Sequence, residues 1–237
     1  MMDFFAKSHI GLRDKNEDNY LALNLDGRAL LLAVADGVGG ANAGEVASKM
    51  AIDIISTNQD RLLKSISTPA LSVALAVEDS LREIFQEANN AIALRSSNDI
   101  RTSGMATTLT VVLLVDRTLY IMHIGDSRAY LLHGSHLEKL TIDHIHNDSS
   151  MLLKYLGDNK YITPDFYCYN IMYGDLVVLC TDGIYNNLDI KGFTRLIRQH
   201  KHLDLCAEGV IEYINEHGAN DNMTILLAHC MHKESNI

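Results

Sequence analysis

The chain has 237 residues, of which 47% are hydrophobic and 21% are charged, and this balance excludes an intrinsically disordered chain. The formal net charge of −10 argues against nucleic acid as a partner, because nucleic-acid binding requires a basic surface. The N-terminal stretch "MMDFFAKSHIG" is too short and too polar for a signal peptide, and no apolar run in the sequence approaches the length of a membrane span. Since the chain has only two Pro and no linker-like tract, residues 1–237 are expected to form one domain.

Short apolar runs that are rich in β-branched residues and end at Gly, Asp or Asn predict strands. The predicted strands are residues 30–37, 107–116, 119–126, 128–134, 175–183 and 223–230. Apolar residues at helical spacing predict helices over residues 44–66, 70–95, 192–200 and 204–218, and Asp204 and Gly218 are typical start and stop signals for the last of these. Strands and helix pairs therefore alternate in blocks, which predicts an α+β fold with helices covering antiparallel sheets.

Carboxylates recur where the predicted strands end. Asp36 precedes Gly37, Asp126 follows Gly125, and Asp182 precedes Gly183, while "NED" (16–18) and "NDN" (220–222) add further acids. If these strand ends meet at one rim, the carboxylates repel one another unless cations neutralise them, and oxygen ligands without a matching His and Cys set suit Mg²⁺ or Mn²⁺. The absence of a Cβ on Gly37 would let the chain turn sharply there and bring a backbone carbonyl close to a metal. The alternative for each single Asp-Gly pair is an ordinary turn.

Seven segments in order carry a resemblance to a known family. They are "GLRDKNEDNY" (11–20), "VADGVGGANAGEVAS" (34–48), "SGMATTLTVVLL" (103–114), "HIGDSRAYLL" (123–132), "LTIDH" (140–144), "GDLVVLCTDGIYNNL" (174–188) and "NDNMTILLA" (220–228). With these segments the chain resembles the PPM/PP2C family of metal-dependent protein serine/threonine phosphatases in its bacterial form. The resemblance implies a four-layer α/β/β/α sandwich, in which two antiparallel sheets are flanked by helix pairs and a metal centre lies in a cleft at one end.

The resemblance also implies roles for individual residues. Asp36 would bridge two Mn²⁺ or Mg²⁺ ions, and the Gly37 carbonyl would bind one of them. The first ion would be held by Asp182 and Asp221, and the second by Asp18 and Glu17, partly through water. Asp126 matches a position that helps to bind a third ion in bacterial members, and Arg13 matches the arginine that grips the substrate phosphate. The implied reaction is attack on phosphorus by a water that the metals activate.

The expected partner is a phosphorylated protein, in particular a Ser/Thr kinase or its targets, and no nucleic acid or membrane is expected to bind. We expect a cytoplasmic monomer. Two alternatives remain open: a hydrolase of small phosphoesters, and a regulatory pseudophosphatase that binds phosphoproteins without cleaving them. The retained Asp36, Asp182 and Asp221 argue against the pseudophosphatase.

Some features depart from the family pattern or stand outside it. Val38 occupies the place of a His that eukaryotic relatives carry, and residues 145–157 replace most of a longer flap, so the family's substrate selectivity transfers poorly. The cluster "DHIHND" (143–148) allows a zinc site, although a polar loop with Asp143 and His144 in structural hydrogen bonds is favoured. Cys168, Cys180, Cys206 and Cys230 form no CxxC pair and are expected to be buried free thiols in a reducing compartment.

Overall fold

Strand β3 (Ala29–Val38) is buried on both faces, and this explains its uninterrupted apolar sequence. In the computed structural model, which describes residues 3–38, 43–69, 72–146, 149, 151–158 and 160–230, Leu30, Leu32 and Val34 pack between two sheets. Leu31 and Ala33, on the opposite face, pack against helices. Because side chains alternate along a strand, Asp36 lies on the same face as Leu32 and Val34 and emerges between the sheets at their rim.

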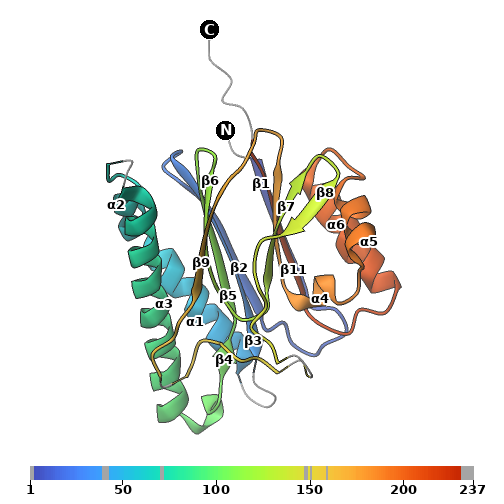
Figure 1. Cartoon of the computed structure of the whole chain (residues 1–237). Coiled ribbons are helices and arrows are strands. Elements are labelled where there is room, and N and C mark those ends of the chain that lie inside the picture. The colour runs from blue at the N-terminus through green and yellow to red at the C-terminus, as the bar shows by residue number, and fades with distance from the viewer. Residues whose placement is uncertain are drawn as a thin grey trace.

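Two antiparallel sheets lie face to face (Figure 1). The first has the order β2-β3-β5-β6-β9, with β4 paired to β3. Its other strands are β2 (Asp18–Leu25), β4 (Ala106–Thr107), β5 (Leu109–Val115), β6 (Thr118–Ile124) and β9 (Asp165–Asn170). The second has the order β1-β11-β10-β7-β8. Its strands are β1 (Asp3–His9), β7 (Arg128–His133), β8 (His136–Lys139), β10 (Leu176–Cys180) and β11 (Met223–His229).

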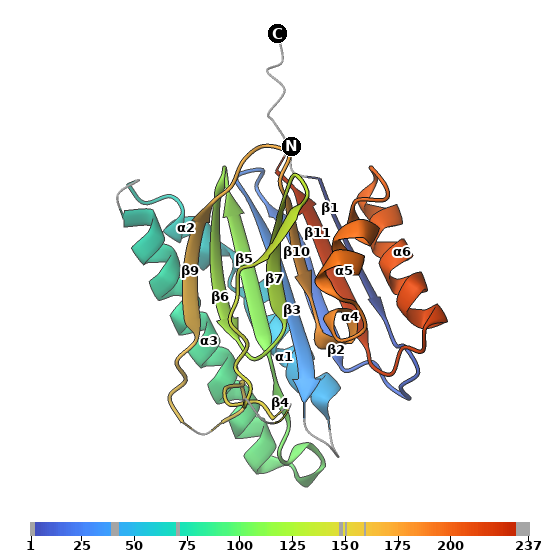
Figure 2. The same ribbon diagram turned by 45° about the vertical axis from the view of Figure 1, so that its right-hand side comes forward.

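Helices cover the outer face of each sheet, as Figures 1 and 2 show. The first sheet is covered by α1 (Gly44–Thr57), α2 (Gln59–Ser65) and α3 (Val73–Asn98), and a short 3₁₀ helix, η2 (Ile100–Thr102), follows α3. The second sheet is covered by α4 (Asp182–Tyr185), α5 (Ile190–Ile197) and α6 (Leu203–Glu216). The predicted α+β class and the α/β/β/α layering are therefore confirmed.

The predicted elements differ from the observed ones in a systematic way. The six predicted strands correspond to the interior strands of the two sheets, while the four strands that were not predicted, β1, β2, β8 and β9, lie at sheet edges. The helix predicted over 44–66 is two helices that meet at Asn58. The strand predicted over 175–183 ends at Cys180, and Asp182 begins α4 instead.

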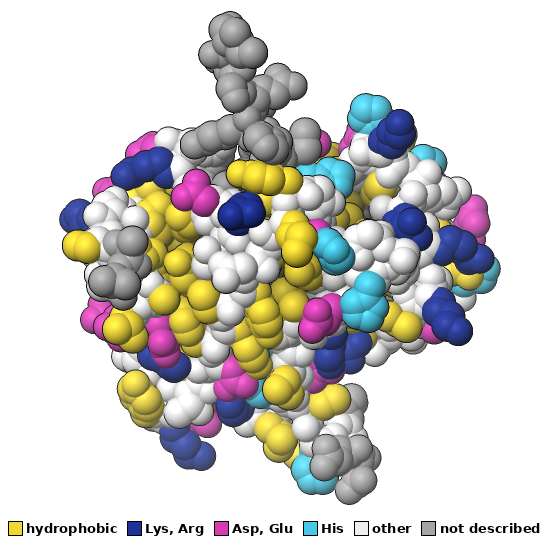
Figure 3. All heavy atoms as spheres, turned by 45° about the horizontal axis from the view of Figure 1, so that its top comes forward, with side chains coloured by type: hydrophobic (Ala, Val, Ile, Leu, Met, Phe, Trp, Pro, Cys, Tyr) yellow, Lys and Arg dark blue, Asp and Glu magenta, His cyan; other side chains and the backbone are white. Residues whose placement is uncertain are grey.

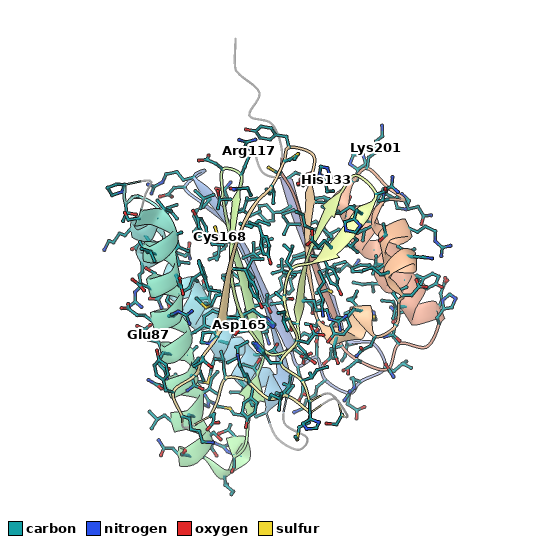
Figure 4. The ribbon with its side chains drawn as sticks, in the orientation of Figure 1. Glu87, Arg117, His133, Asp165, Cys168 and Lys201 are labelled. Atoms are coloured by element: carbon teal, nitrogen blue, oxygen red, sulfur yellow. The ribbon has the colours of Figure 1, made fainter. Side chains whose placement is uncertain are left out.

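One prediction about the cysteines is wrong. All four are free thiols, and Cys180, Cys206 and Cys230 are buried, but Cys168 is exposed on the edge strand β9 (Figure 4). Cys168 belongs to the last strand of its sheet, which has a neighbouring strand on one side only. Among the described residues, no helix combines the length and the apolarity needed to cross a membrane. The assignment of residues 1–237 to one domain stays a prediction.

Candidate active site

A pocket of about 330 Å³ opens at the rim where β3 ends and α4 begins, at the lower edge of the sandwich in Figure 1. It gathers residues from the beginning, the middle and the end of the chain. The lining residues are Arg13, Glu17, Asp36, Gly37, Val38, Asp126, Arg128, Ile145, Leu152, Asp182, Tyr185, Asn186, Asp221 and Asn222. Every site residue predicted from the sequence lines this pocket except Asp18, which is buried behind it.

Asp18 reaches the site through strand register. It lies directly opposite Asp36 in the pairing of β2 with β3, so both side chains point between the sheets. One carboxylate oxygen of Asp18, Oδ2, accepts hydrogen bonds from Thr181 Oγ1 at 2.8 Å and Thr224 Oγ1 at 2.6 Å; Thr181 follows β10 and Thr224 lies in β11 of the other sheet. The second oxygen, Oδ1, is buried and has no hydrogen-bond partner in the described chain. An orphaned buried carboxylate oxygen is the kind of atom that a cation satisfies.

Gly183 brings Asp182 close to Asp221. A Cβ on Gly183 would lie 1.9 Å from the backbone oxygen of Asn222, so no other residue allows the start of α4 to pack against this loop. Asp182 begins the helix, and Asp221 is fixed by a 2.8 Å hydrogen bond from the Asn222 backbone N–H to its Oδ1. The Asp-Gly pair at 182–183 is therefore a close approach of two backbones at a helix start, rather than the turn that was its alternative.

Gly37 also serves close packing, and the sharp turn expected there is absent. β3 continues through Gly37, which pairs with Thr107 of β4. A Cβ on Gly37 would lie 2.3 Å from the backbone of Gly44, the first residue of α1. The missing side chain thus lets α1 begin against the end of β3, beside Glu17, whose carbonyl accepts the Gly37 N–H at 3.1 Å. Gly39 and Gly40 lie outside the described residues.

Asp126 is presented by a constrained bend. Gly125 has φ +112°, and a Cβ there would lie 2.5 Å from the side chain of Thr108. The backbone of Gly125 is held by two hydrogen bonds to His144. The ring Nδ1 of His144 accepts the Gly125 N–H at 3.1 Å, and the backbone N–H of His144 donates to the Gly125 carbonyl at 2.8 Å. Tyr185 donates its hydroxyl to the Asp126 carbonyl at 3.0 Å. The Asp126 side chain, half-buried, lines the pocket.

Burial and mutual repulsion make ionisation of the carboxyl groups in this site unfavourable. Burial raises the pKa of Asp36 well above its ordinary value, and repulsion from neighbouring carboxylates raises it further. Burial, followed by the charge of Asp221, raises the pKa of Asp182 to about 7. Burial also raises the pKa of Asp18 to about 6, although its two threonine hydrogen bonds oppose that shift. Groups that share a desolvated site in this way are stabilised as anions by cations.

Two arginines border the acidic pocket. Arg13 is exposed, and it donates from Nη2 to Asp221 Oδ2 at 2.8 Å and from Nε to the Asn220 carbonyl at 3.0 Å. Arg128, which the sequence reasoning missed, is bound by Asp143 through Nη2 at 2.6 Å, and its guanidinium lies 3.4 Å from the ring centroid of Tyr185. Its place in "GDSR", two residues after Asp126, was the available signal.

The site fits hard cations by the chemistry of its donors, but its side chains do not form a closed cage. No group of three or more His, Cys, Asp and Glu side chains in the described part of the chain is disposed to hold an ion unaided. Ligands from water and from the backbone would therefore have to complete the coordination, as is usual for Mg²⁺. Carboxylate oxygens remain the donor type that Mg²⁺ and Mn²⁺ prefer.

The alternative zinc site at 143–148 finds no support in its described residues. Asp143 binds Arg128 and Lys139. His144 accepts from Gly125 and contacts Asp165 Oδ2 at 3.1 Å. The structural role expected for Asp143 and His144 is therefore confirmed, while Asn147 and Asp148 lie outside the described residues.

The shortened flap leaves a small apolar wall on the pocket. Ile145 and Leu152 form an isolated β-bridge, and both line the pocket together with Val38. Leu156 pairs with Thr107 and thereby ties the end of this segment to β4. The described ends of the segment that replaces the flap thus lie at one side of the pocket.

Comparisons with known proteins agree with this geometry. Residues 6–225 match the family model described as Protein phosphatase 2C. The chain is 30% identical over 234 residues to the serine/threonine phosphatase stp of Listeria monocytogenes, covering 91% of this chain and 90% of the relative. It superposes on the crystal structure of the Mycobacterium tuberculosis serine/threonine phosphatase PstP/Ppp with a TM-score of 0.82 and 28% identity, over 98% of this chain and 99% of that one. A second structure, the catalytic domain of PstP in complex with two manganese ions, gives a TM-score of 0.79 and 29% identity, over 96% of this chain and 97% of that one.

Proposed function

Since this chain belongs to the protein phosphatase 2C family and is a protein serine/threonine phosphatase, we propose that its acidic pocket is the catalytic centre and that Asp36 is the central metal ligand. The observation that carries the proposal is the convergence of Asp36, Asp126, Asp182 and Asp221 from four separate stretches of the chain in one pocket. The proposal is supported by the raised pKa values of Asp36, Asp126 and Asp182, because they indicate that the ionised carboxylates are costly without nearby positive charge. Structural reasons alone rarely preserve such a cost, whereas a metal centre requires it.

We propose two Mn²⁺ or Mg²⁺ ions as the cofactors and assign the ligands by position. Asp36, with the Gly37 carbonyl beside it, would be the central ligand, and Asp182 and Asp221 would hold the first ion. Asp18, with its orphaned buried oxygen, and Glu17 serve the second ion, directly or through water. Asp126 lines the same pocket near Asp182 and is the proposed ligand of a third ion. When bound, such ions supply the positive charge that activates a water and stabilises the transferring phosphoryl group.

The other residues of the pocket bind and orient. Thr181 and Thr224 fix the Asp18 carboxylate by two hydrogen bonds, which orient its free oxygen. Arg13 lies at the mouth, anchored to Asp221 and Asn220, and its planar guanidinium matches two oxygens of a phosphate group. In the proposal Arg13 keeps the substrate phosphate in line with the attacking water. Val38, Ile145 and Leu152 form the apolar border on which the substrate backbone rests.

Phosphoproteins are the substrates of a phosphatase of this type, and we propose that they include a Ser/Thr kinase or its targets. The proposal is supported by the chemistry of the reaction, because such a phosphatase acts on the groups that such a kinase adds. Incubation with an autophosphorylated kinase from the same organism, followed by mass spectrometry of its phosphosites, tests this. Retention of every phosphosite at enzyme concentrations that hydrolyse a phosphothreonine peptide would exclude the kinase itself.

The decisive experiment measures hydrolysis of a phosphothreonine peptide and of p-nitrophenyl phosphate with Mn²⁺, with Mg²⁺ and with EDTA. We expect turnover with added metal and none with chelator. Asp36→Asn should remove the activity, whereas the matched variant Asp79→Asn, which changes an exposed aspartate on α3, should keep it. Turnover in excess EDTA with no bound metal would contradict the proposed mechanism. Hydrolysis of p-nitrophenyl phosphate without hydrolysis of any phosphopeptide would favour small phosphoesters as substrates.

A further inference from the structure

Helix α5 and the turn after it carry a concentration of positive charge in a strongly acidic protein. Residues 190–202, "IKGFTRLIRQHKH", contain Lys191, Arg195, Arg198 and Lys201 and no Asp or Glu. All four side chains are exposed. Figure 3 shows Lys, Arg and His side chains gathered on the right-hand side of the molecule, where α5 and the β7–β8 hairpin lie, and Lys201 points outward in Figure 4.

These cations are unpaired, unlike most other cations of the protein. Within the described chain, Lys191, Arg195, Arg198 and Lys201 make no ion pair with an acidic side chain. On the opposite helix layer, by contrast, Lys49 pairs with Asp53 at 2.9 Å and Arg82 with Glu78 at 2.7 Å. The positive charge on α5 is therefore not used to hold the fold together and remains available to an anionic partner.

The surface around these cations is hollowed on both sides of α5. A hollow of about 630 Å³ separates α5 from the β7–β8 hairpin, where its lining includes His136, Lys191, Arg195 and Arg198. A second hollow, of about 530 Å³, lies between α5 and α6, and Lys191 and Arg195 line it as well. We call these two hollows together the α5 groove. The single carboxylate in their lining, Asp189, already accepts the backbone N–H of Gly192 at 2.6 Å.

The α5 groove begins beside the catalytic pocket. Asn186 lines the pocket, and the next residue, Asn187, lines the hollow between α5 and α6. Asn187 is fixed at the end of α4 by a 2.8 Å hydrogen bond from its side-chain amide to the Gly183 carbonyl. A peptide whose phosphoresidue occupies the pocket can therefore continue over α4 into the groove within a few residues.

We propose that the α5 groove binds an acidic segment that flanks the phosphoresidue in the protein substrates, so that this phosphatase prefers phosphosites with nearby Asp, Glu or further phosphate groups. The inference rests on the proposed function of the adjacent pocket. An extended peptide fits the groove better than a membrane does, because a chain can follow the hollows beside the α5 cations, whereas a concave surface does not lie flat on a bilayer.

The test compares two phosphothreonine peptides that differ only in whether Asp and Glu or Ser and Gln flank the phosphoresidue. The wild type should show a higher kcat/KM for the acidic peptide by about ten-fold at low salt, mainly through KM, and less at high salt. The variant Lys191→Glu/Arg195→Glu should abolish or invert this preference. The control Lys64→Glu/Arg95→Glu, which makes the same charge change at exposed, unpaired cations on α2 and α3, should retain it.

The outcomes distinguish a failure of this inference from a failure of the proposed function. Equal kcat/KM for the two peptides in the wild type, or equal loss of preference in the α5 and control variants, would overturn the inference while leaving the catalytic centre intact. If the wild type with Mn²⁺ hydrolysed neither peptide nor p-nitrophenyl phosphate, the proposed function would fail. Fluorescence anisotropy with a labelled, unphosphorylated acidic peptide would then decide the inference, with binding in the wild type and the control but not in the α5 variant as the supporting result. Binding of phosphatidylserine vesicles or of a DNA oligonucleotide through α5, without binding of the acidic peptide, would contradict it.

Discussion

The molecule holds two neighbouring concentrations of like charge that differ in sign and in burial. The acidic pocket gathers Asp36, Asp126, Asp182 and Asp221 in a partly buried space, and the α5 groove gathers Lys191 and Arg195 in water. Burial raises the pKa of Asp36 and of Asp182, because each carboxylate loses solvent and meets the charge of the others.

Burial, rather than the number of charges, determines how much a cluster of like charges lowers the stability of the fold. In a desolvated pocket like charges repel strongly, so the carboxylates need counter-ions and their removal should change both catalysis and stability. In water the same repulsion is screened, so the α5 cations cost the fold little and can be kept for a partner. The variants below test this contrast, beginning with the largest expected effect.

The largest effect is expected from Asp36→Asn. The change removes the carboxylate that is central to the proposed ion pair, and kcat on a phosphothreonine peptide with saturating Mn²⁺ should fall by several orders of magnitude. Steady-state kinetics beside Asp79→Asn as control provides the measurement. A fall of only a few-fold would remove Asp36 from the centre of the mechanism.

Arg13→Ala should weaken phosphate recognition more than folding. Each charge-assisted hydrogen bond to phosphate is worth about 1.5–3 kcal/mol, so kcat/KM should fall by at least about ten-fold. Arg13→Lys should recover only part of the loss, since an ammonium lacks the bidentate fork. The melting temperature should hardly change, because the exposed ion pair of Arg13 with Asp221 contributes little stability. Wild-type kcat/KM in the alanine variant would disprove the phosphate-binding role.

The variant Asp126→Ala distinguishes two roles for Asp126, a metal ligand and a structural residue of the bend. As a lost ligand of a third ion, it should raise the Mn²⁺ concentration for half-maximal activity and reduce peptide turnover, while the melting temperature stays near that of the wild type. The bend itself is held by Gly125, His144 and the Tyr185 hydroxyl, none of which depends on the Asp126 side chain. An unchanged Mn²⁺ requirement together with a large fall in melting temperature would make Asp126 a purely structural residue.

Asp182→Asn should stabilise the metal-free protein at neutral pH although it harms catalysis. The pKa of Asp182 is raised to about 7, so its contribution to stability is present below its ordinary pKa near 3.8 and is lost as the pH rises towards 7. Asparagine does not ionise, so the variant avoids the buried negative charge that the wild type acquires as the pH rises. The melting temperature of the variant in EDTA should therefore exceed that of the wild type by a few degrees at pH 7.5 but not at pH 4.5. If the variant and the wild type had the same melting temperature at each pH, ionisation of Asp182 would not destabilise the fold.

The smallest effect is expected from Arg195→Gln on stability. The side chain is exposed and makes no ion pair in the described chain, so the free energy of unfolding should stay within about 0.5 kcal/mol of the wild type. Urea denaturation at pH 7.5 measures it. A loss of more than about 1 kcal/mol would show that α5 uses its cations for folding, and the contrast with the acidic pocket would fail.

The elements of the fold were predictable from the sequence where burial requires continuous apolar runs. Interior strands such as β3 and β10 are covered on both faces, so their sequences are continuous apolar runs. The edge strands β1, β2, β8 and β9 mix polar and apolar residues because one side of each is open to solvent, and this mixed pattern does not distinguish a strand from a loop. The break between α1 and α2 at Asn58 was missed because the apolar spacing continues across it.

The residues in and behind the acidic pocket were predictable as a set but not as an arrangement. Asp36, Asp126 and Asp182 end or follow apolar runs, "NED" and "NDN" supplied Asp18 and Asp221, and the resemblance to the family added Arg13. The sequence did not reveal that Arg13 binds Asp221, that Arg128 borders the pocket, or that Gly37 and Gly183 are required by close backbone packing. These are contacts between segments that lie far apart in the chain.

The class of the protein follows from its sequence, because apolar periodicity and the positions of acids and glycines are local properties of each segment. Which charges neutralise one another depends on the tertiary structure. Four carboxylates from separate segments converge without cationic side chains to neutralise them all, and the four cations of α5 and the turn after it make no ion pair with an acid of the described chain. Coulomb energies depend on the distances between charges and on their burial in the folded state, and neither quantity can be read from the sequence.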